Sequence, residues 1–273
     1  MERSRMKDKK FERILRTKSE LKRAVNEGEM KVFLQPQICV SKHRIYGFEA
    51  LVRREHPVFG ILSPHEFLDD MNRMHMMEEL DYFVYREVCL LLKKRMEEGR
   101  PLFRVSCNFC RKQFMDPGFA EQITAIAEEY RIPPKYLALE MIEGQAFQKP
   151  VNGIVQKNVK LLRARGFTVC LDDCGADVSS IGDLMIDSIG QIKLDKRLTD
   201  SIERENVQIL VTGLCQIALQ LQCCVVGEGI ETEQQLNDMR KCGVDIVQGF
   251  YYYKPMEFRA ATELYDLQNG MNG

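Results

Sequence analysis

Between residues 137 and 229 the sequence reads LALEMI at 137–142, TVCLDD at 168–173, QIKLD at 191–195 and QCCVVGEG at 222–229. Each run is short and mostly apolar and carries a charged residue in its second half, a pattern that indicates a buried β-strand. Amphipathic segments at 154–165 and 204–221 separate these runs and are long enough to cross back over a sheet. This stretch therefore predicts strands that are joined by crossover helices.

The same alternation continues outward in both directions. Four more strands are predicted, at 31–36, 46–52, 104–109 and 246–252, and three more amphipathic helices, at 77–97, 118–130 and 232–242. Eight strands that alternate with helices within about 250 residues predict an α/β fold, a TIM-like β/α barrel. The alternative is a doubly wound open sheet, but no glycine fingerprint follows the first strand. The nearest match, Gly227-Glu228-Gly229, has Thr232 where a third glycine would stand.

The composition excludes several classes of protein. With 45% hydrophobic residues among 273, the chain can bury a large core, and general disorder is excluded. No apolar run approaches the ~20 residues that a membrane span needs. The 39 basic and 40 acidic residues give a net charge of −1, which argues against binding to a nucleic-acid polymer.

This balance hides a basic N-terminal arm on an acidic body. Residues 1–23 hold ten basic and four acidic side chains, a net of +6, so the remaining 250 residues carry a net of −7. We predict a basic connector helix over 1–27, the barrel domain over 28–258 and a C-terminal helix or tail over 259–273. The arm is interpreted as a solvated helix, with nucleic-acid or membrane contact as the alternative.

The cysteines and histidines form no metal-binding pattern. The ten cysteines are scattered, and Cys107 and Cys110 have CxxC spacing without a second pair, so we predict buried thiols there rather than zinc. The four histidines make no HxxxH motif, and any metal site must therefore use oxygen ligands. The charged N-terminus is no secretory signal, and with so many cysteines it indicates a reducing, cytoplasmic location.

Polar residues stand near the end of nearly every predicted strand. They are Glu49, Asn108, Glu140, Asp172, Asp173, Lys193, Glu228 and Gln248, with Glu143 and Glu231 just beyond their strands. Burying one bare carboxylate is costly, but in a barrel these positions converge on the C-terminal mouth, where active sites of this fold lie. Carboxylates that converge there repel one another unless Mg²⁺, Mn²⁺ or alternatively Ca²⁺ neutralises them.

Adjacent acids point to opposite sides of a strand, so Asp172 and Asp173 can share a metal pair only if the backbone turns. Gly175 directly afterwards is consistent with such a turn. Two metals ~3.5–4 Å apart are the usual arrangement for in-line attack on a phosphodiester. The residues alone therefore predict a metal-dependent hydrolase of a phosphate ester.

The hexapeptide Phe48-Glu49-Ala50-Leu51-Val52-Arg53 resembles the signature of the EAL domain family, and the resemblance extends over about residues 20–258. The order and spacing of further motifs fit the family: Gln35-Pro36, Pro57 through Pro64, Asn108, Glu140-Met141-Ile142-Glu143, Asp172-Asp173, Lys193-Leu194-Asp195, Glu228-Gly229-Ile230-Glu231-Thr232, Gln248-Gly249-Phe250 and Lys254-Pro255. The resemblance implies a barrel that hydrolyses cyclic di-GMP, a bacterial second messenger, to linear pGpG with two Mg²⁺ or Mn²⁺ ions. It also implies a homodimer and an upstream sensor or diguanylate-cyclase-like domain.

The resemblance also implies a role for each matching residue. The ligands of one ion would be Glu49, Asn108, Glu140 and Asp172, and Asp173 would help to hold the second. Lys193 would orient the attacking water and Glu228 would be the general base. Glu231 and Gln248 would support the metal site and the water network, and Glu143 would anchor a loop. The dinucleotide would contact Gln35, Leu51 and Arg53, with Arg53 on phosphate.

The loop after the paired aspartates departs from the family pattern. Cys174 replaces an aromatic residue, Asp177 a glycine and Val178 a tyrosine, while Arg54 replaces an aromatic residue after Arg53. These changes motivate an alternative, a weak or inactive EAL domain that acts as a cyclic di-GMP-binding regulatory module. A protein-interaction scaffold on a degenerate barrel is a third reading, against which the complete ligand set counts.

Overall fold

The computed structural model describes residues 18–142, 153–175 and 183–269, and within them eight strands close into a barrel. The barrel strands are β1 (Met30–Cys39), β2 (Arg44–His56), β4 (Val105–Cys110), β5 (Leu137–Ile142), β6 (Thr168–Cys174), β7 (Gln191–Leu194), β8 (Cys224–Gly227) and β9 (Ile246–Val247). Around the barrel they follow the order β1-β9-β8-β7-β6-β5-β4-β2, and pairing of β1 with β2 closes the ring. Two short strands, β3 (Gly60–Leu62) and β10 (Met256–Glu257), extend β2 and β1. The predicted TIM-like barrel is confirmed.

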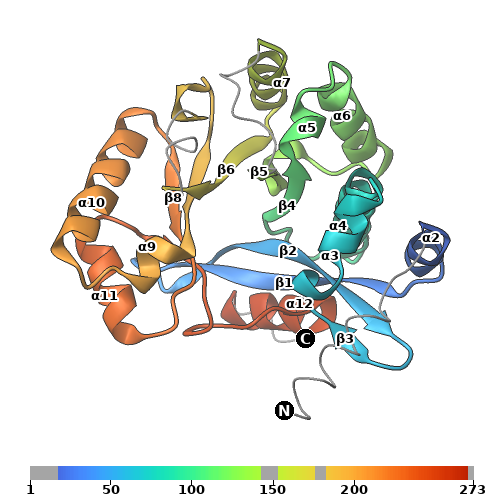
Figure 1. Ribbon diagram of the computed structural model, residues 1–273, viewed down its shortest axis with the longest axis horizontal. Coiled ribbons are helices and arrows are strands. Elements are labelled where there is room, and N and C mark those ends of the chain that lie inside the picture. The colour runs from blue at the N-terminus through green and yellow to red at the C-terminus, as the bar shows by residue number, and fades with distance from the viewer. Residues whose placement is uncertain (1–17, 143–152, 176–182, 270–273) are drawn as a thin grey trace.

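Helices surround this barrel on its outer side, as Figure 1 shows. The α-helices are α2 (Lys18–Asn26), α3 (Leu68–Arg73), α4 (Met77–Glu97), α5 (Arg111–Phe114), α6 (Phe119–Glu129), α7 (Gly153–Ala164), α9 (Lys196–Asp200), α10 (Glu205–Gln220), α11 (Glu233–Lys241) and α12 (Phe258–Gln268). Short 3₁₀ turns occupy η1 (Pro64–Glu66), η2 (Pro134–Tyr136) and η3 (Asp183–Met185). The five amphipathic segments expected from the sequence all form helices, with ends that shift by at most a residue.

The first strand departs from the expected alternation. β1 runs antiparallel to both neighbours, with Gln35 opposite Glu49 on β2 and Ile38 opposite Val247 on β9, whereas the other barrel strands pair in parallel. Only residues 40–43 connect β1 to β2, which is too short for a crossover helix and forces a hairpin. The alternation of strands and helices therefore does not extend to β1 and β2, between which the sequence predicts no helix.

Two predicted strands are also too long. The strand expected over 246–252 ends at Val247, because the chain turns to pack on residue 230: the amide of Ile230 donates to the Gln248 carbonyl at 3.1 Å. A Cβ on Gly249 would lie 2.0 Å from the Ile230 carbonyl oxygen, so only glycine permits this approach. The strand expected over 222–229 begins at Cys224, because Gln222 adopts a left-handed φ of 57°.

The C-terminal helix belongs to the barrel wall. Tyr265 of α12 packs on Phe103 with ring centroids 4.9 Å apart, and Phe48 of β2 completes the aromatic cluster. Arg95 of α4 reaches Asp266 of α12 at 2.7 Å in a buried ion pair. Of the predicted connector helix, α2 lies within the described residues, whereas residues 1–17 lie outside them.

A smaller apolar cluster joins α2 to the extension formed by β3, η1 and α3. Its buried members are Ala24, Met30, Leu62, Phe67, Met71, Met76 and Leu80. Beside it, the buried Arg54 guanidinium pairs with Glu29 at 2.8 Å, which gives the unexpected arginine after Arg53 a structural partner.

Two further expectations concern the cysteine thiols and the length of the apolar helices. All ten cysteines are free; Cys107 is buried and Cys110 is half-buried. Among the described residues no helix is both long enough and apolar enough to cross a bilayer.

Candidate functional site

The mouth of the barrel holds one lysine among four carboxylates. Lys193 on β7 is 1% exposed, and its Nζ has four carboxylate neighbours. Its distances are 2.6 Å to Glu140 Oε2, 2.7 Å to Glu228 Oε1, 3.2 Å to Asp172 Oδ1 and 3.3 Å to Glu49 Oε2. The structure thus brings together the polar residues that the sequence places at the strand ends.

Strand register explains this convergence. Asn108 on β4 stands opposite Glu140 on β5 in the parallel ladder, and Lys193 on β7 stands opposite Val226, two residues before Glu228. Glu49 enters from β2, where its Oε1 accepts a hydrogen bond from Asn108 Nδ2 at 3.0 Å. The carboxyl ends of parallel strands therefore deliver these side chains to one layer of the barrel.

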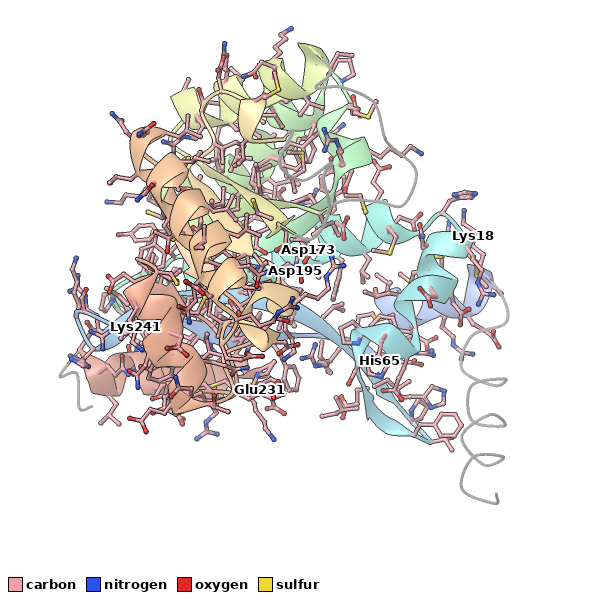
Figure 2. All side chains as sticks on the ribbon, turned by 60° about the vertical axis from the view of Figure 1, so that its left-hand side comes forward. Lys18, His65, Asp173, Asp195, Glu231 and Lys241 are labelled. Carbon is pink, nitrogen blue, oxygen red and sulfur yellow. The ribbon has the colours of Figure 1, made fainter. Side chains whose placement is uncertain are left out.

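The backbone turns where the two adjacent aspartates require it. Asp173 has a left-handed φ of 52°, and the ladder between β6 and β7 shifts register between Leu171 and Cys174. Gly175 follows with a φ of 88°. As a result, carboxylate oxygens of Asp172, Asp173 and Glu228 lie within 4.8 Å of one another. Figure 2 shows Asp173 beside Asp195 at this mouth.

Several buried oxygens at the mouth have no hydrogen-bond donor among the residues that the structure describes. They are Asn108 Oδ1, Glu140 Oε1 and Asp172 Oδ1, of which the last contacts Lys193 only as an ion pair. Buried acceptors without donors are rare in folded proteins, and oxygen-only sets of carboxylates and amides are the ligands of hard divalent cations. The donor set therefore fits Mg²⁺ or Mn²⁺.

Burial raises the pKa values of several carboxyls at the mouth. Burial raises the pKa of Glu140 to about 8, against the attraction of Lys193, and raises the pKa of Glu228 well above its usual range. Burial and the neighbouring carboxylates Asp172 and Asp195 raise the pKa of Asp173 to about 6. A mouth without bound cations therefore retains protons on part of its carboxylates near neutral pH.

The surroundings of Lys193 and Glu49 stabilise both side chains in their ionised forms. Burial opposes the charge of Lys193, but the four carboxylates outweigh it and hold its pKa well above the usual range. Burial likewise opposes the charge of Glu49, yet Lys193, Asn108 and Gln248 together lower the pKa of that carboxyl. Glu49 and Lys193 are thus the fixed ion pair of the mouth.

Three glutamines form a hydrogen-bonded group beside Glu49. Gln248 Nε2 donates to Glu49 Oε2 at 2.5 Å and to Gln35 Oε1 at 3.2 Å, and Gln35 Nε2 donates to the Tyr253 carbonyl at 3.2 Å. The third glutamine, Gln37, donates to Gln248 Oε1 at 3.0 Å. Sequence reasoning missed Gln37, although two glutamines spaced two apart in a strand share one face.

Other predicted residues lie outside this cluster. Leu51 and Arg53 follow Glu49 at alternate positions of β2, and Arg53 Nη1 donates to the Val52 carbonyl at 2.8 Å, with its guanidinium 5.7 Å from the Phe33 ring centroid. Glu231 pairs with Lys196 at 2.9 Å, and Figure 2 shows it apart from Asp173. Glu143 and residues 176–178 lie outside the described residues.

The fold and the site together define the protein as a closed β/α barrel with an acidic mouth centred on Lys193. The family model of the EAL domain matches residues 18–255, and the chain belongs to this family. One curated relative is the cyclic di-GMP phosphodiesterase RocR of Pseudomonas aeruginosa, 26% identical over 235 residues, which cover 86% of this chain and 59% of RocR. Another is the probable cyclic di-GMP phosphodiesterase PdeG of Escherichia coli, 27% identical over 259 residues, covering 92% and 49%. The chain therefore spans about half the length of these relatives.

Solved structures support the same fold. The PaMucR phosphodiesterase in complex with c-di-GMP superposes with a TM-score of 0.80 at 22% identity, over 89% of this chain and 98% of that one. The Xanthomonas citri FimX EAL domain in complex with c-di-GMP gives a TM-score of 0.78 at 20% identity, over 93% and 97%.

Proposed function

We propose that this protein hydrolyses cyclic di-GMP to linear pGpG with the help of two divalent cations, Mg²⁺ or Mn²⁺. One observation carries the proposal: Lys193 and four carboxylates converge at the barrel mouth, together with buried oxygens that have no donor within the described part of the chain. Relatives that are named cyclic di-GMP phosphodiesterases support the choice of substrate.

The residues of the mouth would hold the ions in two groups. Glu49, Asn108, Glu140 and Asp172 would ligate one ion, and Asp173 would help to hold the second. Such ions supply Lewis acidity, which acidifies water and neutralises charge on a phosphodiester. They would also balance the excess of carboxylates over Lys193, so that an anionic dinucleotide can approach.

Two side chains of the protein would then orient the attacking water and accept its proton. Lys193 would orient the attacking water by donating a hydrogen bond to its oxygen. Glu228, 2.7 Å from Lys193 Nζ, would accept the water proton as general base. The water oxygen forms a bond to phosphorus while the bond from phosphorus to the 3′ oxygen breaks, and that oxygen takes up a proton. Opening one of the two phosphodiesters turns the ring into linear pGpG.

Surrounding residues would support these steps. Gln248, which donates to Glu49 at 2.5 Å, would hold the metal site, and Glu231 would support the water network. Gln35, Leu51 and Arg53 would contact the dinucleotide, with the Arg53 guanidinium on a phosphate, where two parallel hydrogen bonds fit the oxygens.

The family resemblance extends the proposal beyond the mouth. It includes Glu143 as the anchor of its loop, residues 1–27 as a connector, 28–258 as the barrel unit, and 259–273 as its C-terminal helix and tail. It also includes a homodimer, an upstream sensor or diguanylate-cyclase-like domain, and a cytoplasmic location.

Turnover of the purified protein tests the proposal. The protein is incubated with cyclic di-GMP and Mn²⁺ or Mg²⁺, and the nucleotides are resolved by chromatography, with Glu228→Gln as the matched inactive variant. We expect pGpG from the wild type and none from the variant. Folded wild-type protein that makes no pGpG with either metal at any pH would sink the proposal.

The alternative, a cyclic di-GMP-binding regulatory module without turnover, depends on the altered loop at 174–178. Cys174 of this loop is buried at the end of β6, and residues 176–178 lie outside the described residues. Calorimetry that shows nucleotide binding without any pGpG would favour this reading over hydrolysis.

A further inference from the structure

A chain of buried amides connects Gln37 to the carboxylate of Glu49. Gln37 Nε2 donates to Gln248 Oε1 at 3.0 Å, and Gln248 Nε2 donates to Glu49 Oε2 at 2.5 Å. Gln37, Gln248 and Glu49 are all at most 5% exposed, so water does not substitute for these hydrogen bonds. No other contact of Gln37 with the mouth is recorded among the described residues.

The antiparallel first strand creates this arrangement. Ile38 on β1 stands opposite Val247 on β9, so the neighbouring positions Gln37 and Gln248 face each other at the end of that ladder. The partner of Gln37 on β2 is Gly47, which presents no side chain and at which a Cβ would lie 3.0 Å from the Arg104 carbonyl oxygen. The register thus supplies Gln37 with its partner.

The direction of donation is what matters chemically. An amide has one oxygen that accepts and one nitrogen that donates. Because Gln37 donates to its oxygen and Gln35 accepts from its nitrogen at 3.2 Å, Gln248 presents this nitrogen to the carboxylate of Glu49 as well. A reversed Gln248 would set its oxygen against that carboxylate, where two acceptors repel.

The other carboxylate oxygen of Glu49 accepts from a second amide, that of Asn108. Asn108 Nδ2 donates to Glu49 Oε1 at 3.0 Å, which leaves Asn108 Oδ1 buried and without a donor from residues 18–142, 153–175 or 183–269. Both amides that flank Glu49 therefore donate to it. The oxygen of Gln248 accepts from Gln37, and the oxygen of Asn108 is the one that would be available to a cation.

We propose that Gln37 is a positioning residue, which fixes the amide of Gln248 so that it donates to Glu49 and holds this carboxylate in the orientation that binds the divalent cation. The inference rests on the proposed function, since it assigns Glu49 to the metal site. Gln37 touches neither substrate nor metal in this role, and it acts through Gln248 alone.

Direct metal binding tests the inference without any substrate. Mn²⁺ affinity is measured by titration calorimetry on the full chain, for the wild type, for Gln37→Met, which keeps the shape without a donor, and for Gln37→Glu, which offers only acceptors at neutral pH. Substitution of a residue that orients a metal ligand typically lowers the affinity for the metal by about 10–100-fold. We expect about a tenfold loss for Gln37→Met and a larger loss for Gln37→Glu.

A matched control separates this role from simple loss of a buried amide. Gln191 is 1% exposed on β7 and accepts from Arg104 Nη2 at 2.8 Å, with no recorded contact to Glu49. Gln191→Met should keep wild-type Mn²⁺ affinity, and all three variants should show a cooperative unfolding transition in EDTA. At saturating Mn²⁺, Gln37→Met should keep the wild-type KM for cyclic di-GMP.

Three outcomes would overturn the inference. Gln37→Met that binds Mn²⁺ as tightly as the wild type refutes it, and so does an equal loss in Gln191→Met. If the wild type binds Mn²⁺ and the Gln37 variants lose affinity as expected, but the wild type never makes pGpG, the inference is supported and the proposed hydrolysis is refuted. Wild-type protein that binds no Mn²⁺ contradicts both.

Discussion

Replacing Glu140 by glutamine removes a charge from the mouth while it keeps the shape of the side chain. Glu140 is fully buried, its Oε2 lies 2.6 Å from Lys193 Nζ, and its Oε1 has no donor. A glutamine oxygen can still accept from Lys193, and its nitrogen would take the place of Oε1. Glu140→Gln therefore mimics the protonated carboxyl.

The stability effect follows from the pKa of Glu140, which burial raises from 4.5 to about 8. Between these values the folded state keeps a proton that the unfolded state has lost, so wild-type stability falls as the pH rises through this window. Each pH unit costs up to about 1.4 kcal/mol, which amounts to at most about 5 kcal/mol at pH 8. The variant lacks this dependence and should be the more stable protein at pH 8 without metal.

Urea unfolding in EDTA at pH 5 and pH 8 measures this difference. We expect similar free energies of unfolding for both proteins at pH 5 and a more stable variant at pH 8. Added Mn²⁺ should stabilise the wild type by mass action and leave the variant nearly unchanged, because the variant lacks a carboxylate ligand. A variant that is less stable than the wild type at pH 8 in EDTA would refute the reasoning.

Three further substitutions test separate parts of the account. Glu228→Gln should lower hydrolysis by about 10²–10⁴-fold in a turnover assay yet retain nucleotide binding by calorimetry, and near-normal turnover would exclude it as the general base. Gly175→Ala should lower the free energy of unfolding by about 1–3 kcal/mol, since φ is 88° and a Cβ would lie 2.7 Å from Leu198 Cδ1; an unchanged urea midpoint would contradict this. Arg53→Lys should raise the KM for cyclic di-GMP about tenfold with little change in kcat, because lysine lacks the guanidinium fork, and an unaltered KM would remove Arg53 from the substrate site.

The barrel and the convergence of its polar residues were predictable because they depend on local patterns. Short apolar runs separated by amphipathic segments fix the strands, and Glu140 and Lys193 interrupt such runs near their ends. The reversed direction of β1 follows from its short connection to β2. The early end of β9 depends on the contact between Gly249 and Ile230, which follow two different strands and carry no local signal in the sequence.

The supporting residues of the site were harder to predict than the charged ones. Gln37 acquires its role from the register of β1 against β9, and a single glutamine in a strand does not reveal its partner. Glu231 follows Glu228 by three residues, and no signal in the sequence indicates that it pairs with Lys196 at 2.9 Å. Charge at strand ends is visible in sequence, whereas the direction of a hydrogen bond is visible only in three dimensions.

Hydrolysis of cyclic di-GMP in ¹⁸O-labelled water tests the central claim most directly. The purified protein is incubated with the nucleotide and Mn²⁺, and the product is analysed by mass spectrometry. Direct attack of water, with Glu228 as base, predicts pGpG that carries one solvent oxygen on its terminal phosphate. Metal-bound, folded protein that leaves cyclic di-GMP intact, or pGpG without the label, would contradict the account.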